Sequence, residues 1–139
     1  DAKESFSAEF CDPDCKTVHA GHLAMARVGG GRVSISDMKT GGMDLKLRER
    51  RLALKKGEKD AELDALMKSK EKSFPATVSD GGWHRLTFTL KGNEATVAID
   101  GKVAGSLNSE GFAHPTKKQF RLMVGKSAEI DDVKIWKAD

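Results

Sequence analysis

The stretch Trp83-His84-Arg85-Leu86-Thr87-Phe88-Thr89-Leu90 decides the fold, because its apolar residues fall at every second position. Such alternation is typical of a β-strand that buries one face. It returns in residues 95–99 after a turn at 91–93, and Asp100-Gly101 then supplies the positive φ of a tight hairpin. Three further runs continue the series: 102–107, 120–124 and 130–136. Short strands at this spacing predict an antiparallel sandwich or barrel.

The first half of the chain predicts more strands and one helix. The expected strands are 5–10, 22–28, 32–36, 43–48 and 74–78. Leu63, Leu66 and Met67 form an apolar stripe that acidic residues precede and lysines follow, an order that suits a helix dipole. Pro75 lacks an amide hydrogen and confines its strand to a sheet edge or a strand start. We expect an all-β, antiparallel jelly-roll sandwich with one α-helix inserted near residues 58–69.

The composition and the charge of the chain argue against a membrane-spanning role and against a nucleic-acid partner. The chain has 139 residues, and none of its apolar runs approaches the about 20 residues of a membrane span. Its net charge is +3, and the segment from Asp44 to Lys72 carries all of that excess, with ten Lys or Arg against seven Asp or Glu. Aromatic residues do not alternate with these basic ones, and acids lie among them, so we expect no nucleic-acid partner.

Several motifs resemble a known group of proteins. Residues 82–86, 99–103 and 129–136 resemble concanavalin A-like jelly rolls, above all laminin-G-like domains and the bacterial DUF1080 group of 3-keto-disaccharide hydrolases. Small proteins of planctomycete type are similar over nearly the whole chain, at 19–22, 48–51, 83–85 and 114–117.

In those similar proteins, further strands usually precede the equivalent of Phe6. The resemblance therefore implies a single jelly-roll domain over residues 1–139 that lacks its N-terminal strand or strands. A complementing polypeptide or a second copy of the chain could then complete the sheet.

Two cysteines and two histidines lie close together near the start of the chain. Cys11 and Cys15 enclose Asp-Pro-Asp, which suggests a small disulfide loop, favoured by an oxidising compartment, or metal ligation. With His19 and His22 they could hold a tetrahedral zinc. Free thiols are the third alternative. We expect no cofactor, although zinc or calcium could bind.

Hydrolysis of a glycoside needs two carboxyl groups on either side of the scissile bond. The strand motif Glu-x-Asp-x-x-Glu of family 16 hydrolases begins at Glu129, but Lys134 stands where its second Glu should be. A retaining mechanism of that kind is therefore disfavoured. Glu49 is the remaining weak candidate for a catalytic carboxylate.

A binding site is the stronger expectation. In an extended strand, Arg48 and Arg50 would share one face around Glu49, and such guanidinium groups suit carboxylates, sulfates or sugar hydroxyls. Trp83 and Trp136 are expected in the core, and Phe112 is the better candidate for an exposed ring. The expected ligand-binding residues are His19, His22, Arg48, Glu49, Arg50, Phe112 and His114.

Three functions remain open from the sequence. The first is a non-catalytic carbohydrate- or surface-binding module of an exported protein, either secreted, periplasmic or at the cell surface. The second is a hydrolase of a 3-keto-disaccharide or related glycoside, implied by the resemblance alone. The third is a structural subunit that another chain completes. The partner of the binding module would be a glycan or an anionic surface.

Overall fold

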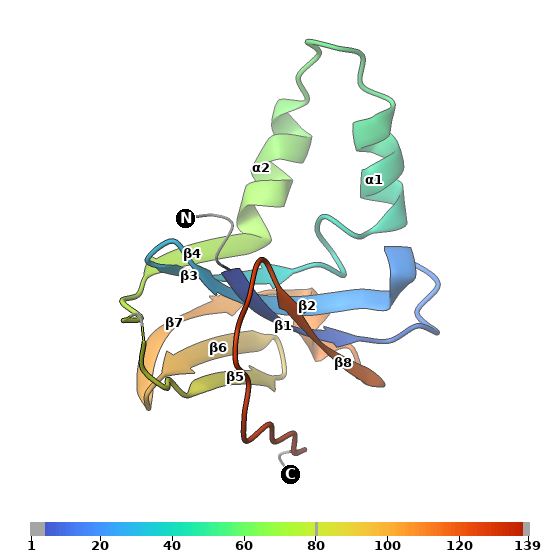
Figure 1. The fold of residues 1–139 in the computed structure, drawn as a ribbon. Helices are drawn as coiled ribbons and strands as arrows, with labels where there is room; N and C mark the ends of the chain where they lie inside the picture. The colour runs from blue at the N-terminus through green and yellow to red at the C-terminus, as the bar shows by residue number, and fades with distance from the viewer. Residues whose placement is uncertain (1–4, 80, 138–139) are drawn as a thin grey trace.

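The computed structural model describes residues 5–79 and 81–137, which form two antiparallel β-sheets facing each other (Figure 1). The first sheet has the order β4 (Glu71–Pro75), β3 (Arg32–Asp37), β2 (His22–Gly29), β1 (Ser5–Cys11) and β8 (Gln119–Val124). The second has the order β5 (Leu86–Lys91), β6 (Glu94–Ile99) and β7 (Lys102–Asn108). The antiparallel sandwich that the alternation predicted is confirmed. Pro75 lies at the end of β4, an edge strand, which confirms its expected place at an edge.

The core lies between the two sheets and is built mainly from small aliphatic side chains. Its buried members are Ala24, Ala26, Val33, Ile35, Ala95, Val97 and Phe112. At one end of the sandwich, Phe10 of β1 packs against Phe88 of β5 and Phe120 of β8, with ring centroids 5.7 Å and 5.2 Å away. Because side chains alternate along a strand, the neighbours of Phe10 in β1 point to the outer face of the first sheet.

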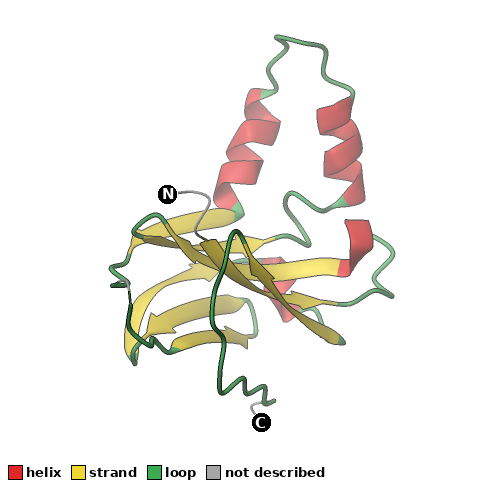
Figure 2. Ribbon diagram, in the orientation of Figure 1, coloured by secondary structure: helices red, strands yellow, loops and turns green. Residues whose placement is uncertain are grey.

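Two helices leave the first sheet between β3 and β4 and rise on its outer side (Figures 1 and 2). They are α1 (Leu45–Leu52) and α2 (Ala61–Ser69), called here the helical hairpin together with their connecting loop. The expected helix near 58–69 is α2. The expected strand at 43–48 is wrong, because the Asp44 carboxylate accepts the amide hydrogen of Leu47 at 2.9 Å and so caps a helix.

Phe112 is also placed differently from the expectation of an exposed ring. It lies in a short 3-10 helix (Glu110–Ala113) and is 1% exposed, because that helix covers one end of the core. Buried Asp37 fastens the helix there by accepting the amide hydrogen of Gly111 at 3.0 Å and the hydroxyl of Ser109 at 2.5 Å. The sequence showed Phe112 only as a loop aromatic.

The last expected strand, 130–136, does not form, and both tryptophans lie outside the core. Residues 126–137 belong to neither sheet, and Asp132 has a φ of 51°, which breaks an extended run. Trp83 is 67% exposed and Trp136 is 71% exposed, because no element packs over them. Within the described residues, no helix combines the length and the apolar character needed to cross a membrane.

Candidate functional site

Three potential metal ligands meet on the outer face of the first sheet, at the end of β1. Glu9 and Cys11 are two residues apart on β1 and so share a face. His22 begins β2 directly opposite Cys11, at a β-bulge in the ladder. The possible ligand atoms of the three side chains all lie within 4.8 Å of one another. We call this group the Glu9 cluster.

The carboxylate of Glu9 is only half satisfied. Its Oε1 is hydrogen-bonded to Nδ1 of His22, but its buried Oε2 has no hydrogen-bond partner among the described residues. Arg121 is its register neighbour on β8, yet the Nη2 of Arg121 donates to Gln119 at 3.0 Å. Since Glu9 is 0% exposed, an unpaired carboxylate oxygen there is unfavourable unless another group binds it.

The two cysteines differ sharply in environment, and both are free thiols. Cys11 is fully buried, and burial, followed by the negative charge of Glu9, raises the pKa of its thiol to about 12. Cys15 is half-buried, and its sulfur lies 3.5 Å from the hydroxyl of Thr17. The disulfide considered from the sequence is therefore not formed in this structure.

The zinc set considered from the sequence is only partly brought together. Cys11 and His22 meet, while Cys15 lies outside the cluster. The ring of His19 stacks against that of His22 at a centroid distance of 6.2 Å. Glu9 was missed, although its position two residues before Cys11 in an alternating strand was the signal that could have found it.

The loop between β1 and β2 holds the cluster in place through Asp12. The amide of Asp12 donates to the carbonyl of Gly21 at 2.8 Å, and its carboxylate accepts from Thr116 and from Nε2 of His114 at 3.1 Å. The hydrogen bond from Thr116 is the main cause that holds the pKa of Asp12 well below its usual range, and the bond from His114 adds to it. Gly21 has a φ of 75°, and a Cβ there would lie 2.3 Å from the Asp12 carbonyl oxygen. The expected ligand residue His114 is thus part of this fastening.

The helical hairpin contains the other expected binding residues, with a different geometry. Arg50 is fully engaged, because its guanidinium binds Asp60 at 2.6 Å and 2.8 Å and Glu62 at 3.0 Å. Arg48 lies on α1 with its Nη1 3.8 Å from the sulfur of Met43, and Glu49 is exposed on the same helix. The predicted extended pairing of Arg48 with Arg50 is wrong, since this segment is helical.

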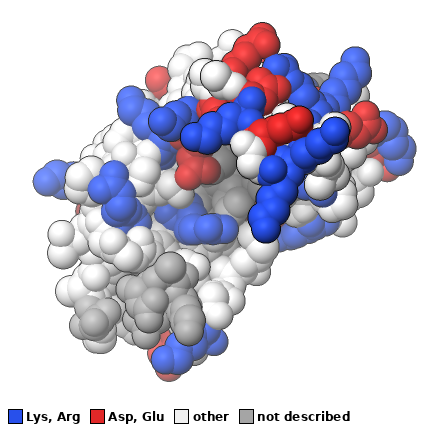
Figure 3. All heavy atoms as spheres, turned by 90° about the horizontal axis from the view of Figure 1, so that it is seen from above, with Lys and Arg blue, Asp and Glu red and all other residues white. Residues whose placement is uncertain are grey.

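The acids of the hairpin are largely used within the fold. Asp44 and Asp60 cap the two helices, and Glu58 accepts the amide hydrogen of Lys55 at 2.8 Å. In contrast, seven basic side chains of the hairpin have no carboxylate partner among the described residues: Lys46, Arg48, Arg51, Lys55, Lys56, Lys59 and Lys68. Seen from above, many Lys and Arg side chains lie on this side of the molecule, with Asp and Glu side chains among them (Figure 3). We call these seven side chains the basic surface.

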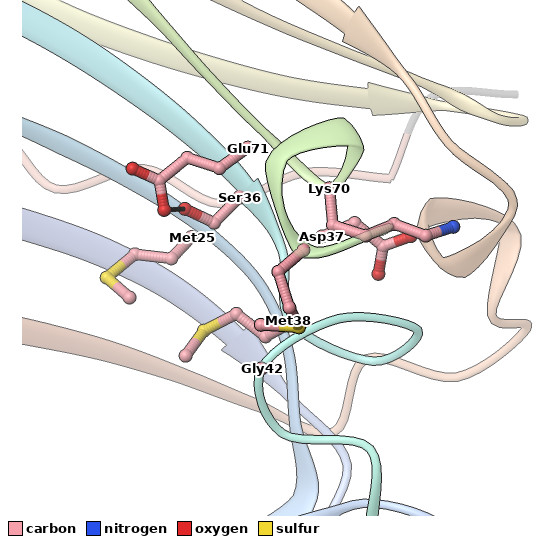
Figure 4. Close-up of a pocket in the computed structure, with 8 residues that line it drawn as sticks. Met25, Ser36, Asp37, Met38, Gly42, Lys70 and Glu71 are labelled. Carbon is pink, nitrogen blue, oxygen red and sulfur yellow. Dashed lines mark hydrogen bonds between the residues drawn. The ribbon is translucent and has the colours of Figure 1, made fainter. Parts of the chain in front are cut away.

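A pocket of about 130 Å³ beside β3 is a weaker candidate (Figure 4). Met25, Met38 and Met67 give it an apolar wall. Its acids are already bonded, since Asp37 is engaged as described and Glu71 accepts the hydroxyl of Ser36 at 3.1 Å. The pocket therefore offers little to a polar ligand.

Ser79, His84 and Asp100 also come together, in a combination known from hydrolases. Nδ1 of His84 lies 2.8 Å from the Asp100 carboxylate, and Nε2 lies 3.1 Å from the carbonyl of Ser79. Nε2 also lies 3.2 Å from the hydroxyl of Ser79, and the hydrogen bond with Asp100 is the main cause that raises the pKa of the ring. These contacts tie the start of β5 to the turn between β6 and β7, and we call the trio the His84 clasp.

The family model of the laminin G domain matches residues 35–138, which include both helices and every strand from β4 to β8. Neither a curated protein nor a solved structure matches the chain.

Proposed function

We propose that this chain, which belongs to the laminin G domain family, is a non-catalytic module that binds an anionic carbohydrate through its basic surface. Laminin G domains are typically extracellular binding modules, and this role accords with an exported protein. The observation that supports the ligand class is the unequal use of charge in the helical hairpin. Most of its acids cap helices or pair internally, whereas most of its cations have no carboxylate partner among the described residues.

The positive charge of the chain is concentrated near this surface, because the segment 44–72 carries the whole excess of +3. Asp60 and Glu62 pair with Arg50, and Asp44 and the same Asp60 accept backbone amide hydrogens at 2.9 Å and 3.0 Å. The cations of the basic surface outnumber the acids left unpaired, within the described residues, on the two helices, which are Glu49 and Asp64. Sulfate and carboxylate groups of a glycan would supply the balancing negative charge, through charge-assisted hydrogen bonds to Lys and Arg.

The hairpin suits recognition by charge better than recognition by ring stacking. Residues 44–70 contain no Phe, Trp or Tyr, so the hairpin has no aromatic plate for a neutral sugar. Its first helix buries none of its residues and rises clear of the sheet (Figure 1). A polymeric ligand could therefore reach it from several sides.

The test measures binding of a fluorescent heparin oligosaccharide at low salt to matched double variants. Lys55→Ala/Lys56→Ala removes two charges from the hairpin loop. The control, Lys91→Ala/Lys102→Ala, removes two exposed charges at the ends of β5 and β7. We expect the hairpin variant to weaken binding about tenfold and the control less than about twofold, with affinity falling as salt rises.

Three results would overturn the proposal. One is equal loss in the control, which would show that net charge alone attracts the ligand. Another is equal affinity for the desulfated, neutralised oligosaccharide. The third is equally tight binding of a single-stranded nucleic acid under the same salt, since the proposed site selects a glycan.

A further inference from the structure

We infer that Glu9, Cys11 and His22 form a binding site for one zinc-type divalent cation. The inference rests on the outer face of the first sheet and does not depend on glycan binding by the hairpin. Three independent features support it: the convergence of the donor atoms, the chemistry of the donors, and the half-satisfied carboxylate.

The donor atoms are already close enough for a common ion. All lie within 4.8 Å of one another. Zinc bonds to oxygen, nitrogen and sulfur are about 2.0–2.3 Å long, so ligand atoms around one zinc lie roughly 3–4 Å apart. Small side-chain rotations would close the difference, without movement of the paired strands β1 and β2.

The donor set selects the class of metal. A thiolate and an imidazole suit zinc and similar transition metals, whereas calcium and magnesium prefer oxygen ligands alone. A cation in this cluster would displace the thiol proton of Cys11 to solvent, while His22 would bind as neutral imidazole and keep its one N–H on the other ring nitrogen. Among the cations considered from the sequence, zinc fits this place and calcium does not.

The unsatisfied oxygen of the Glu9 carboxylate is the observation that points to a bound cation. Its Oε2 is buried and unpartnered in the described part of the chain. A cation bound by both this carboxylate and its neighbours would satisfy that oxygen and neutralise a charge held within the fold. A purely structural Glu9–His22 pair would leave it unsatisfied.

The Glu9 cluster differs from the set of two cysteines and two histidines that was considered from the sequence. Cys15 is not among the converging residues. Three protein ligands leave a fourth coordination position for water or for an outside oxygen, on the side of His22, whose side chain is 18% exposed. His19, stacked on His22, lies beside that opening.

The test uses the untagged full chain, reduced and freed of metal, and follows Co²⁺ binding by absorption. We expect one cobalt per chain, with a thiolate-to-cobalt charge-transfer band and the intense visible bands of tetrahedral cobalt. Cys15→Ser should retain both signals, and Cys11→Ser should lose the charge-transfer band. Glu9→Gln, which keeps the side-chain shape, should weaken binding at least about tenfold.

The matched pairs keep the test decisive even if a variant is unstable. In Cys15→Ser the only thiol left is Cys11, so a charge-transfer band in that protein identifies the ligand without altering the site. Loss of the band in Cys15→Ser would overturn the assignment, as would sub-stoichiometric cobalt in the wild-type chain. Equal affinity of His22→Gln and His19→Gln would overturn the role of His22, and circular dichroism without metal checks that both fold.

Discussion

The two ring nitrogens of His84 are both hydrogen-bonded, Nδ1 to the Asp100 carboxylate at 2.8 Å and Nε2 to Ser79, whose carbonyl lies at 3.1 Å and whose hydroxyl lies at 3.2 Å. The hydrogen bond with Asp100 is the main cause that raises the pKa of His84. The same bond, together with the amide of Arg85 at 2.9 Å, lowers the pKa of Asp100. The charged pair thus ties the start of β5 to the turn between β6 and β7.

This clasp predicts a bell-shaped contribution to stability. A raised histidine pKa stabilises the fold at low pH, and this stabilisation is lost as pH rises through the folded value. A lowered aspartate pKa stabilises it at higher pH, with loss as pH falls through the folded value. The difference in Tm between wild type and His84→Gln should therefore be greatest between about pH 4 and about pH 6.5.

Two measurements check this prediction. Scanning calorimetry across pH gives the Tm difference, and an NMR titration of the His84 ring should give a midpoint above about 6.5. His19→Gln, at a histidine distant from the clasp in the chain, serves as the control for loss of an imidazole. A midpoint at or below the ordinary histidine value would contradict the arrangement.

Single residues of the candidate metal site differ in whether the sequence could predict them. Cys11 and His22 were identifiable because few residue types bind metals and they lie close in sequence. Glu9 was not, because an acid in an amphipathic strand is normally solvent-facing, and its burial depends on a face that only the pairing of β1 with β2 and β8 defines. The bond between His114 and Asp12 could not be predicted either, because the two residues lie 102 positions apart in the chain.

Among the elements, the segment from Met43 to Arg48 shows why alternation can mislead. Met43-Asp44-Leu45-Lys46-Leu47 alternates as a strand would, but a short run of this kind fits more than one period. The Asp44 side chain decides the outcome, because it satisfies the Leu47 amide at the start of α1. In the helix near 58–69 the acid–apolar–lysine order agreed with the apolar period, and that element was predicted correctly.

We predict that Asp44→Ala loosens α1 without unfolding the sandwich. Loss of an N-cap costs about 1 kcal/mol. Because α1 buries none of its residues, that cost should appear as local opening and not as global instability. Hydrogen exchange should show faster exchange of α1 amides, with the amides of β2 and β6 unchanged.

Asp44→Asn is the matched control, since asparagine also caps helices. It should leave exchange in α1 close to that of the wild type. A fall in the protection of β2 and β6 in Asp44→Ala would show that α1 is coupled to the core, contrary to its exposure. Backbone bonds from Leu45 to Thr17 and from His19 to Met43, at 3.0 Å and 2.8 Å, do not involve the altered side chain.

For the whole molecule, the turn residues of the β-strand pairs predicted the structure most reliably. The alternation of residues 130–136 predicted it least reliably. Asp100 and Gly101 have φ values of 53° and 79°, as the predicted tight turn between β6 and β7 requires. Residues 130–136 alternate as well as any strand, but alternation cannot specify a partner edge. In the structure they lie outside both sheets, beside the start of β5, where Lys134 and then Arg85 lower the pKa of Asp132.

This arrangement predicts that both tryptophans are open to solvent, in contrast to the expectation from sequence that they pack in the core. With 67% and 71% exposure, Trp83 and Trp136 should emit at long wavelength, and iodide should quench both. Trp83→Phe and Trp136→Phe isolate each emission, and denatured protein gives the fully quenched reference. Short-wavelength, iodide-shielded emission at every concentration would contradict the exposed positions. Shielding that grows with protein concentration would instead show that a second copy covers the apolar side chains of Ile130, Val133 and Ile135, which are 44–58% exposed.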